Sequence, residues 1–462
     1  MSKQPDSQRH VHRWGLFVIH QRGEGSLVRA LGVWGLAASI VNITVGGGIF
    51  RLPAAAATVL GPAAPVAYVV CAVAMGLIVL CFAEAGSRVS LTGGPYAYVD
   101  VAFGPLVGFL TGVMLWAGIT VATAAVASFF ADTLGALSPA LATGAPRALV
   151  LVGMLVALAA MNIAGIRGAN HFNLVMTVTK VAPLLLLIVI GVGAVHRENF
   201  RWTATPGIAD VSRASIVLIF AFLGVESALV PSGEVHEPAR TVPRALCIAM
   251  VGITLLYLAV QLVTQGILGA SLAGQKTPLA DAAAAVIGPA GRTLILTGMV
   301  VSMFGYVSGM TLAVPRMLFA FGRDGFLPAQ LARVHARWRT PYVAIAVQTV
   351  VVVVLAISGS FEKLVVIANG SVLLVYAACC AGVLELRRRG IREIEAPFRI
   401  PFAAAVPMMA IAVIVWFLTS LTANEWRALL VVVGVSIVVY VSTLPARRSA
   451  RPQMPVPGGD LR

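Results

Sequence analysis

The chain has 462 residues, of which 59% are hydrophobic and only 11% are charged, and its mean hydropathy is +0.92. Soluble domains carry about 25% charged residues, so this composition excludes a soluble globular protein. Apolar stretches of roughly 20 residues recur from end to end, and each is long enough to cross a bilayer. They are continuously apolar, not alternating as in a membrane β-barrel. The sequence therefore predicts an all-α polytopic membrane protein.

The net charge of +15 is distributed unevenly along the chain. We predict twelve membrane spans, and with both termini cytoplasmic they place 23 basic residues on the inner side and 8 on the outer side. This bias follows the positive-inside rule, so the basic excess indicates topology and no nucleic-acid partner. The predicted location is the cytoplasmic (inner) membrane, as a multi-pass protein in the lipid bilayer.

The first apolar stretch, 31–59, contains three consecutive glycines, Gly46 to Gly48. Glycine lets the backbone leave helical geometry at little cost. In lipid, such open backbone survives only where it is buried or lines a cavity. One interpretation is a broken helix whose freed N–H and C=O groups form half of a ligand site. The other is a packing face of small residues against a neighbouring helix.

A second interruption is predicted in the sixth span, where Glu226 follows Gly224 at mid-span and Pro231 and Gly233 come soon after. Two interruptions five spans apart favour the broken-helix interpretation and indicate a five-plus-five inverted repeat with broken helices 1 and 6. The predicted organisation is a cytoplasmic tail (1–28), a first repeat with spans 1–5 (29–200), a second repeat with spans 6–10 (201–390), spans 11 and 12 (391–445) and a cytoplasmic tail (446–462).

Two further ionisable residues lie in or near the spans. Lys180 falls inside the fifth, where a central lysine costs roughly 2.5–3.5 kcal/mol, so it is a functional candidate. If that span begins four residues later, Lys180 would instead reach the inner interface. Glu84 is predicted near the inner edge of the second span, either as an interface carboxylate paired with Arg88 or in a gating role. The five cysteines show no metal or disulfide spacing, so no metal and no cofactor are predicted.

Five segments together resemble the amino acid–polyamine–organocation (APC) superfamily, in the order and at the span boundaries expected for it. The resemblance covers roughly 30 to 445 and is strong because all five occur. The segments are Gly46–Phe50, Ala83–Glu84 with Gly93–Tyr98, Phe220–Glu226 continuing to Glu234 and Pro238, Arg316–Pro328 with Thr340–Pro341, and Ala396–Pro401. The resemblance implies a permease with twelve helices in a five-plus-five inverted repeat, whose relatives import or exchange amino acids and related amines.

An amino acid has a carboxylate and an ammonium group. The broken helices and the family resemblance both indicate that backbone groups bind these two ends. N–H groups at the start of the second half of helix 1 can donate to the carboxylate, helped by the helix dipole. Carbonyls released before each break can accept from the ammonium. Phe220 and Phe222 are either an aromatic lid or core residues. The predicted substrate-binding residues are Ile43, Thr44, Gly46, Gly47, Gly48, Ile49, Phe220, Ala221, Phe222 and Gly224.

Lys180 matches a lysine that many family members carry in helix 5, where the resemblance implies coupling to protons. Burial favours the neutral form of an amine, so a buried lysine can load and release a proton. Glu226 resembles a glutamate of acid-resistance exchangers, and it is either proton-responsive or a structural support of the broken backbone. No acidic cluster is predicted to line the pocket beyond Glu226, which favours substrates with neutral side chains over those with cationic side chains.

The predicted function is secondary active transport of amino acids by alternating access, as proton symport. Amino acid or amine exchange is the first alternative. A membrane receptor that senses amino acids without net flux is an alternative of another class. An enzyme is not predicted, because the spans contain no HExxH or GxSxG motif.

Overall fold

The computed structural model describes residues 32–89, 94–164, 169–202, 205–226, 237–391, 397–400, 402 and 404–449. Every regular element in these ranges is a helix. Seven helices there are long and apolar enough to cross a membrane, and four apolar helices are shorter, at 10–17 residues. The prediction of an all-α polytopic membrane protein is thus confirmed.

The helices of the first part of the chain, with short 3₁₀ helices labelled η, are α2 (Val33–Thr44), η2 (Gly48–Phe50), α3 (Leu52–Leu60), η3 (Gly61–Ala63), α4 (Ala64–Arg88), α5 (Pro95–Phe103), α6 (Pro105–Leu137), η4 (Pro139–Leu141), α7 (Gly144–Ile163), α8 (Ala169–Gly191) and η5 (Val192–Ala194).

The later helices are η6 (Arg197–Phe200), α9 (Ile208–Leu218), η7 (Ile219–Phe222), α10 (Pro238–Leu268), η10 (Gly269–Leu272), α11 (Pro278–Ala313), α12 (Pro315–Arg323), η11 (Ala329–Ala332), α13 (Tyr342–Ser358), α14 (Phe361–Arg388), α15 (Ala405–Leu418) and α16 (Ala423–Ser449).

Several predicted features fall outside the described residues. They are the tail 1–28, the last part of the tail 446–462, Gly93, Pro231, Gly233, Glu234, Ala396 and Pro401. Helix α16 continues past residue 445 to Ser449, so its end lies beyond the predicted boundary of the last span.

The first apolar stretch is interrupted where the glycines predict it. Helix α2 ends at Thr44, residues 45–47 form a bend, and the short helix η2 follows before α3 begins at Leu52. Pro53 lies in the first turn of α3, where its missing N–H leaves no partner unsatisfied. The stretch is therefore two half-helices joined by open backbone.

The second interruption follows α9 and η7. The backbone becomes extended at Leu223, and Gly224 has a φ of 109°. A side chain is strained at such an angle, whereas glycine adopts it readily. The described part of this segment ends at Glu226, so the structure describes the start of the interruption.

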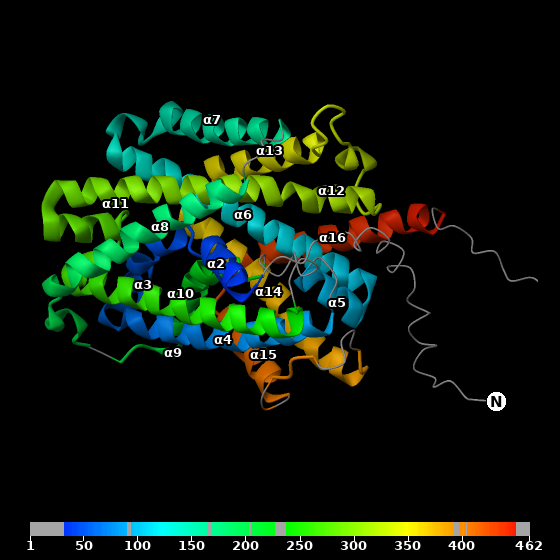
Figure 1. Ribbon diagram of the computed structural model, residues 1–462, viewed down its shortest axis with the longest axis horizontal. Coiled ribbons are helices and arrows are strands. Elements are labelled where there is room, and N and C mark those ends of the chain that lie inside the picture. Colours follow the sequence, from blue (N-terminus) through cyan, green and yellow to red (C-terminus); the bar gives the residue numbers. More distant parts are fainter. Residues whose placement is uncertain are drawn as a thin grey trace, which may run out of the picture.

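The helices pack in two groups that face each other. In one group, α4 and α2 pack on α10, and α3 packs on α9. In the other, α6 packs on α5, α11, α13 and α14. Figure 1 shows α11 and α13 towards one long edge of the molecule and α4, α9 and α10 towards the other, with the blue half-helices α2 and α3 between them. Both interruptions belong to the first group, which is called the bundle group below, and α6 and α14 belong to the second, the scaffold group.

Replacing Gly224 by alanine should destabilise the fold. A Cβ there would lie 2.7 Å from Ile43 Cγ2, and the positive φ adds strain, together costing at least about 1–3 kcal/mol. Gly252→Ala, on α10, is the matched control, because its Cβ would meet nothing within 4 Å. Thermal unfolding of the purified variants measures the effect, and equal midpoints for both would contradict it.

Candidate functional site

The two interruptions touch each other directly at their glycines. A Cβ on Gly48 would lie 2.8 Å from the ring of Phe220, and one on Gly224 would lie 3.3 Å from the Ile43 carbonyl oxygen. Only residues without a side chain allow the Gly48 backbone to come this close to the Phe220 ring and the Gly224 backbone to come this close to the backbone of Ile43. The residues of the two breaks, far apart in the sequence, therefore form one continuous region.

A small cavity lies in this region. It is lined by Thr44, Gly46, Gly47, Gly48, Val126, Phe220, Leu223 and Tyr306. None of these eight residues carries a charged side chain. The cavity amounts to about 10 Å³, which is about the room that one water molecule needs. An amino acid fits only if the lining residues move apart.

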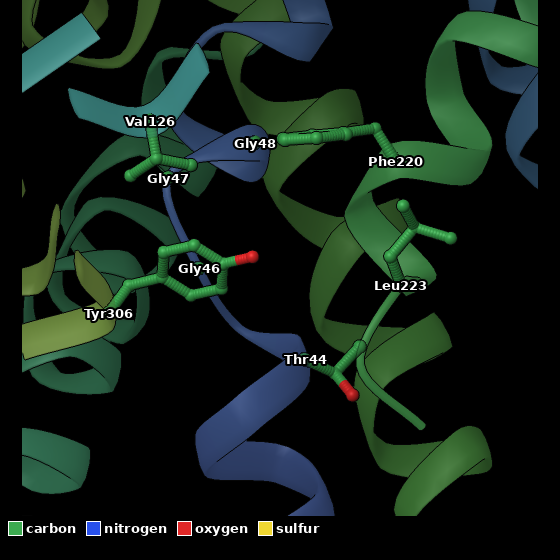
Figure 2. Close-up of a pocket in the computed structure, with 8 residues that line it drawn as sticks. All are labelled: Thr44, Gly46, Gly47, Gly48, Val126, Phe220, Leu223 and Tyr306. Carbon is green, nitrogen blue, oxygen red and sulfur yellow. The ribbon is translucent and has the colours of Figure 1, made fainter. Parts of the chain in front are cut away.

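Helices of the scaffold group cover the open backbone of the first break. Figure 2 shows the Tyr306 ring lying across Gly46, Val126 beside Gly47 and the Phe220 ring reaching towards Gly48. A Cβ on Gly46 would lie 3.2 Å from the Tyr306 ring, and one on Gly47 would lie 3.1 Å from Val126. The glycines thus keep the first break within contact distance of α6 and α11.

Backbone carbonyls that the breaks release are bound by buried side chains. Lys180 Nζ on α8 donates to the Asn42 carbonyl at 2.9 Å. The Tyr257 hydroxyl on α10 lies 3.1 Å from the Thr44 carbonyl and 2.8 Å from the Ala221 carbonyl. With one proton, this hydroxyl donates to one carbonyl at a time, so it connects the two breaks.

Glu226 binds the backbone of the second break at Gly224. Its two carboxylate oxygens accept the Gly224 N–H at 3.1 and 3.0 Å, and the Tyr376 hydroxyl of α14 donates to one of them at 2.5 Å. The Tyr376 ring also packs edge-on against Phe82 of α4. The carboxyl group therefore links the interrupted backbone to the scaffold group.

Arg51 directly follows η2 and connects the first break to α6 and to the start of α14. Its guanidinium donates to Asp132 of α6 at 3.2 Å and to Glu362 of α14 at 2.5 Å. It also lies over the rings of Phe129 and Phe361, 5.4 and 5.2 Å from their centroids. Because the Phe361 ring packs edge-on against Phe220, this cluster borders the cavity through two aromatic rings.

The residues predicted to bind substrate divide into three sets. Those that line the cavity are Thr44, Gly46, Gly47, Gly48 and Phe220. Those that form or flank the contact between the breaks are Ile43, Ala221 and Gly224. Ile49 and Phe222 are buried but do not line the cavity, and Phe222 packs on the Tyr257 ring. Lys180 and Glu226 lie outside the lining, each bonded to the backbone near a different break.

Sequence reasoning missed Val126 and Tyr306 in the lining and Tyr257 and Tyr376 as side chains that bind the broken segments. A signal for the tyrosines was present. Membrane-protein tyrosines prefer the interfaces, and a buried tyrosine hydroxyl usually finds a partner, so tyrosines at mid-span indicate a polar task. Within the described ranges, no group of three or more His, Cys, Asp or Glu side chains could hold a metal ion.

Two interrupted helices that meet at a buried cavity inside a polytopic helical bundle are typical of secondary transporters. A model of the family described as amino acid permease matches residues 31–444. The chain therefore belongs to the amino acid permease family.

Curated relatives are similar over nearly their whole length. The chain is 29% identical to the methylthioribose transporter of Bacillus subtilis, over 90% of this chain and 93% of the relative. It is 26% identical to the branched-chain amino acid permease BcaP of the same organism, again over 90% and 93%. It is 25% identical to the serine/threonine exchanger SteT of that organism, over 92% of this chain and 98% of the relative. All three are named for transport and none for an enzymatic reaction.

Replacing Tyr376 by phenylalanine should lower stability, because it removes a donor from the buried Glu226 carboxyl. Loss of one partner of a buried polar group costs about 1–3 kcal/mol. Tyr68→Phe is the matched control, because the Tyr68 hydroxyl is equally buried and has no partner among the described residues. The control should be neutral in thermal unfolding, and an equal effect of the two substitutions would contradict the role of Tyr376.

Proposed function

We propose that the chain is a secondary active transporter that moves amino acids across the cytoplasmic membrane by alternating access, coupled to protons. The observation that carries this proposal is the bond from Lys180 Nζ to the Asn42 carbonyl, in the last turn of α2 before the first break. It joins an ionisable group directly to the backbone that leads into the cavity.

The substrate would be held mainly by backbone. The N–H groups of Gly47, Gly48 and Ile49 begin the second half-helix, and the first N–H groups of a helix have no partner within it. They are therefore suited to bind the carboxylate. The Asn42, Thr44, Phe220 and Ala221 carbonyls already have donors. The ammonium would therefore be bound by other carbonyls beside the breaks, those of Ile43, Val45, Phe222 and Leu223.

The proposed substrates carry a neutral side chain. The cavity lining includes no charged side chain, and the side chains of Val126, Phe220, Leu223 and Tyr306 are apolar or aromatic. A substrate cation or anion would lose its hydration there without gaining a counter-charge, which is costly. Three of the relatives are named for compounds without net charge: branched-chain amino acids, serine and threonine, and methylthioribose.

Lys180 would couple proton movement to the first break. As an ammonium it donates a charge-assisted bond to the Asn42 carbonyl, which is roughly twice as strong as a neutral bond. Deprotonation weakens this bond and frees the end of α2 to move. Proton release and movement of the half-helix would thus occur together.

Exchange without proton coupling is the second candidate. It is favoured by the similarity to the serine/threonine exchanger and by Glu226, which binds the second break and would respond to protons in place of Lys180. A receptor that binds amino acids without flux is the remaining alternative, and transport measurements separate all three.

For topology we propose twelve spans in a five-plus-five inverted repeat, with repeats at 29–200 and 201–390 and both termini in the cytoplasm. The seven long and four shorter apolar helices, together with α9 and η7, support this number. The interruptions after α2 and after η7 support the repeat, because inverted repeats place broken helices at corresponding positions.

Uptake into proteoliposomes tests the proposed function. An inward acid gradient should stimulate uptake of a radiolabelled neutral amino acid, and Lys180→Ala should abolish the stimulation. Lys276→Ala is the matched control, because Lys276 is an exposed lysine between η10 and α11 and should leave uptake unchanged.

Three results would contradict symport. Full gradient-driven uptake by Lys180→Ala would exclude the lysine as the coupling group. Uptake that depends on internal substrate and ignores the gradient would indicate exchange. Binding without any uptake would favour the receptor.

A further inference from the structure

Glu84, in the last turn of α4, is fully buried and accepts bonds from two arginines and the backbone. The Arg88 and Arg387 side chains donate Nε–H at 2.9 and 2.7 Å, and a second nitrogen of each lies at 2.8 and 2.5 Å from the carboxylate. The Ile400 N–H donates at 2.9 Å. Arg387 belongs to the last turn of α14. This cluster therefore joins the bundle group to the scaffold group by a charged contact.

The cluster lies at one end of α14. A helix of 28 residues is about 40 Å long, so Arg387 and Glu362 lie near opposite ends of it. Tyr376, which binds Glu226 at the second break, lies between them. The cluster at Arg387 therefore lies farther towards the end of α14 than Tyr376, the residue that binds the second break.

That contact is closed in this structure. Next to the cluster, Cys81 of α4 contacts Cys380 of α14, and Phe82 of α4 packs against Tyr376 of α14. All four side chains are buried. The thiols of Cys81 and Cys380 are neighbours across the contact. A cavity of about 10 Å³ cannot admit an amino acid until some contact of this kind opens.

The arrangement of the two arginines suits a contact that opens and closes. Arg88 is four residues from Glu84 on the same helix, so it stays with the carboxylate when α4 moves. Arg387 has 20% of its side chain exposed and can reach water once it is released. Separation therefore leaves neither charge buried without a partner, which would otherwise be strongly destabilising.

We propose that the Glu84–Arg387 ion pair is a lock between α4 and α14, and that it breaks when the cavity opens towards the end at which both helices finish. The inference rests on the proposed alternating access and assigns the gating role to named residues. Arg88 acts as the partner that keeps Glu84 neutralised in the open state.

Native cysteines report on the lock. Cys81 lies one turn before Glu84 and Cys380 two turns before Arg387, and both are fully buried, whereas Cys247 on α10 is exposed. In the purified, reconstituted full chain, labelling by a small maleimide can be followed at each cysteine by peptide mass spectrometry. Arg387→Ala should increase the labelling rates of Cys81 and Cys380 about tenfold or more, while Cys247 reacts at its original rate.

Two variants sharpen the comparison. Arg388→Ala, at the next position, is the matched control, because Arg388 is 75% exposed and pairs with Glu385 at the surface. It should leave both labelling rates unchanged. Arg387→Lys keeps the charge but loses the paired geometry, so its rates should lie between those of wild type and Arg387→Ala.

Unchanged rates at Cys81 and Cys380 in Arg387→Ala would overturn the proposal, as would an equal increase in Arg388→Ala. A parallel increase at Cys71, in the first half of α4, would indicate general loosening and would also overturn it. If Arg387→Ala does not remain folded, Arg387→Lys decides by the same criteria. Labelling requires no substrate, so failed uptake by wild type would reject the proposed function separately from the lock.

Discussion

Every backbone N–H and C=O group inside a bilayer needs a hydrogen-bond partner, and this requirement governs the structure around the two interruptions. The interruptions after α2 and after η7 release several such groups. Lys180 binds one carbonyl before the first break, Tyr257 lies between one carbonyl from each break, and Glu226 accepts the N–H of Gly224. These side chains satisfy part of the open backbone, and they also connect it to α8, to α10 and to the carboxyl group of Glu226.

Helix α14 contacts both interrupted segments and α4 at points along its whole length. Glu362 binds Arg51 at its start, Asn369 donates to the Ile216 carbonyl of α9 at 2.5 Å, and Tyr376 binds Glu226 near its middle. Arg387 binds Glu84 at its end. One helix therefore contacts both interrupted segments. Charged contacts at its two ends and neutral or singly charged contacts in its middle are consistent with opening at one end at a time.

The interruptions could be predicted from the sequence because their cause is local. Three glycines in one apolar stretch, and a glutamate beside Gly224 in another, are each unfavourable in an ordinary membrane helix, and both positions are interrupted in the structure. Lys180 and Glu226 stood out for the same reason, since a charged group in hydrocarbon is costly wherever its partners lie.

The partners could not be predicted, because they depend on which helix faces which. Val126 and Tyr306 lie in spans that are apolar on nearly all sides, so periodicity does not show which face meets the glycines. Arg387 is 303 residues away from Glu84, and the nearer Arg88 was the partner that spacing suggested; the structure shows both. Phe220 lines the cavity, whereas Phe222 packs on Tyr257. This difference also depends on tertiary packing.

In the proposed mode of recognition, open backbone at the two breaks would bind the carboxylate and ammonium groups shared by all amino acids. Thermal stabilisation of the purified protein by a neutral amino acid, its N-acetyl derivative and its carboxamide tests this claim most directly. A ligand at 100 times its Kd adds about 2.7 kcal/mol to the stability of the folded state. The amino acid should raise the unfolding midpoint and both derivatives should fail to do so, whereas equal stabilisation by all three compounds would contradict backbone recognition.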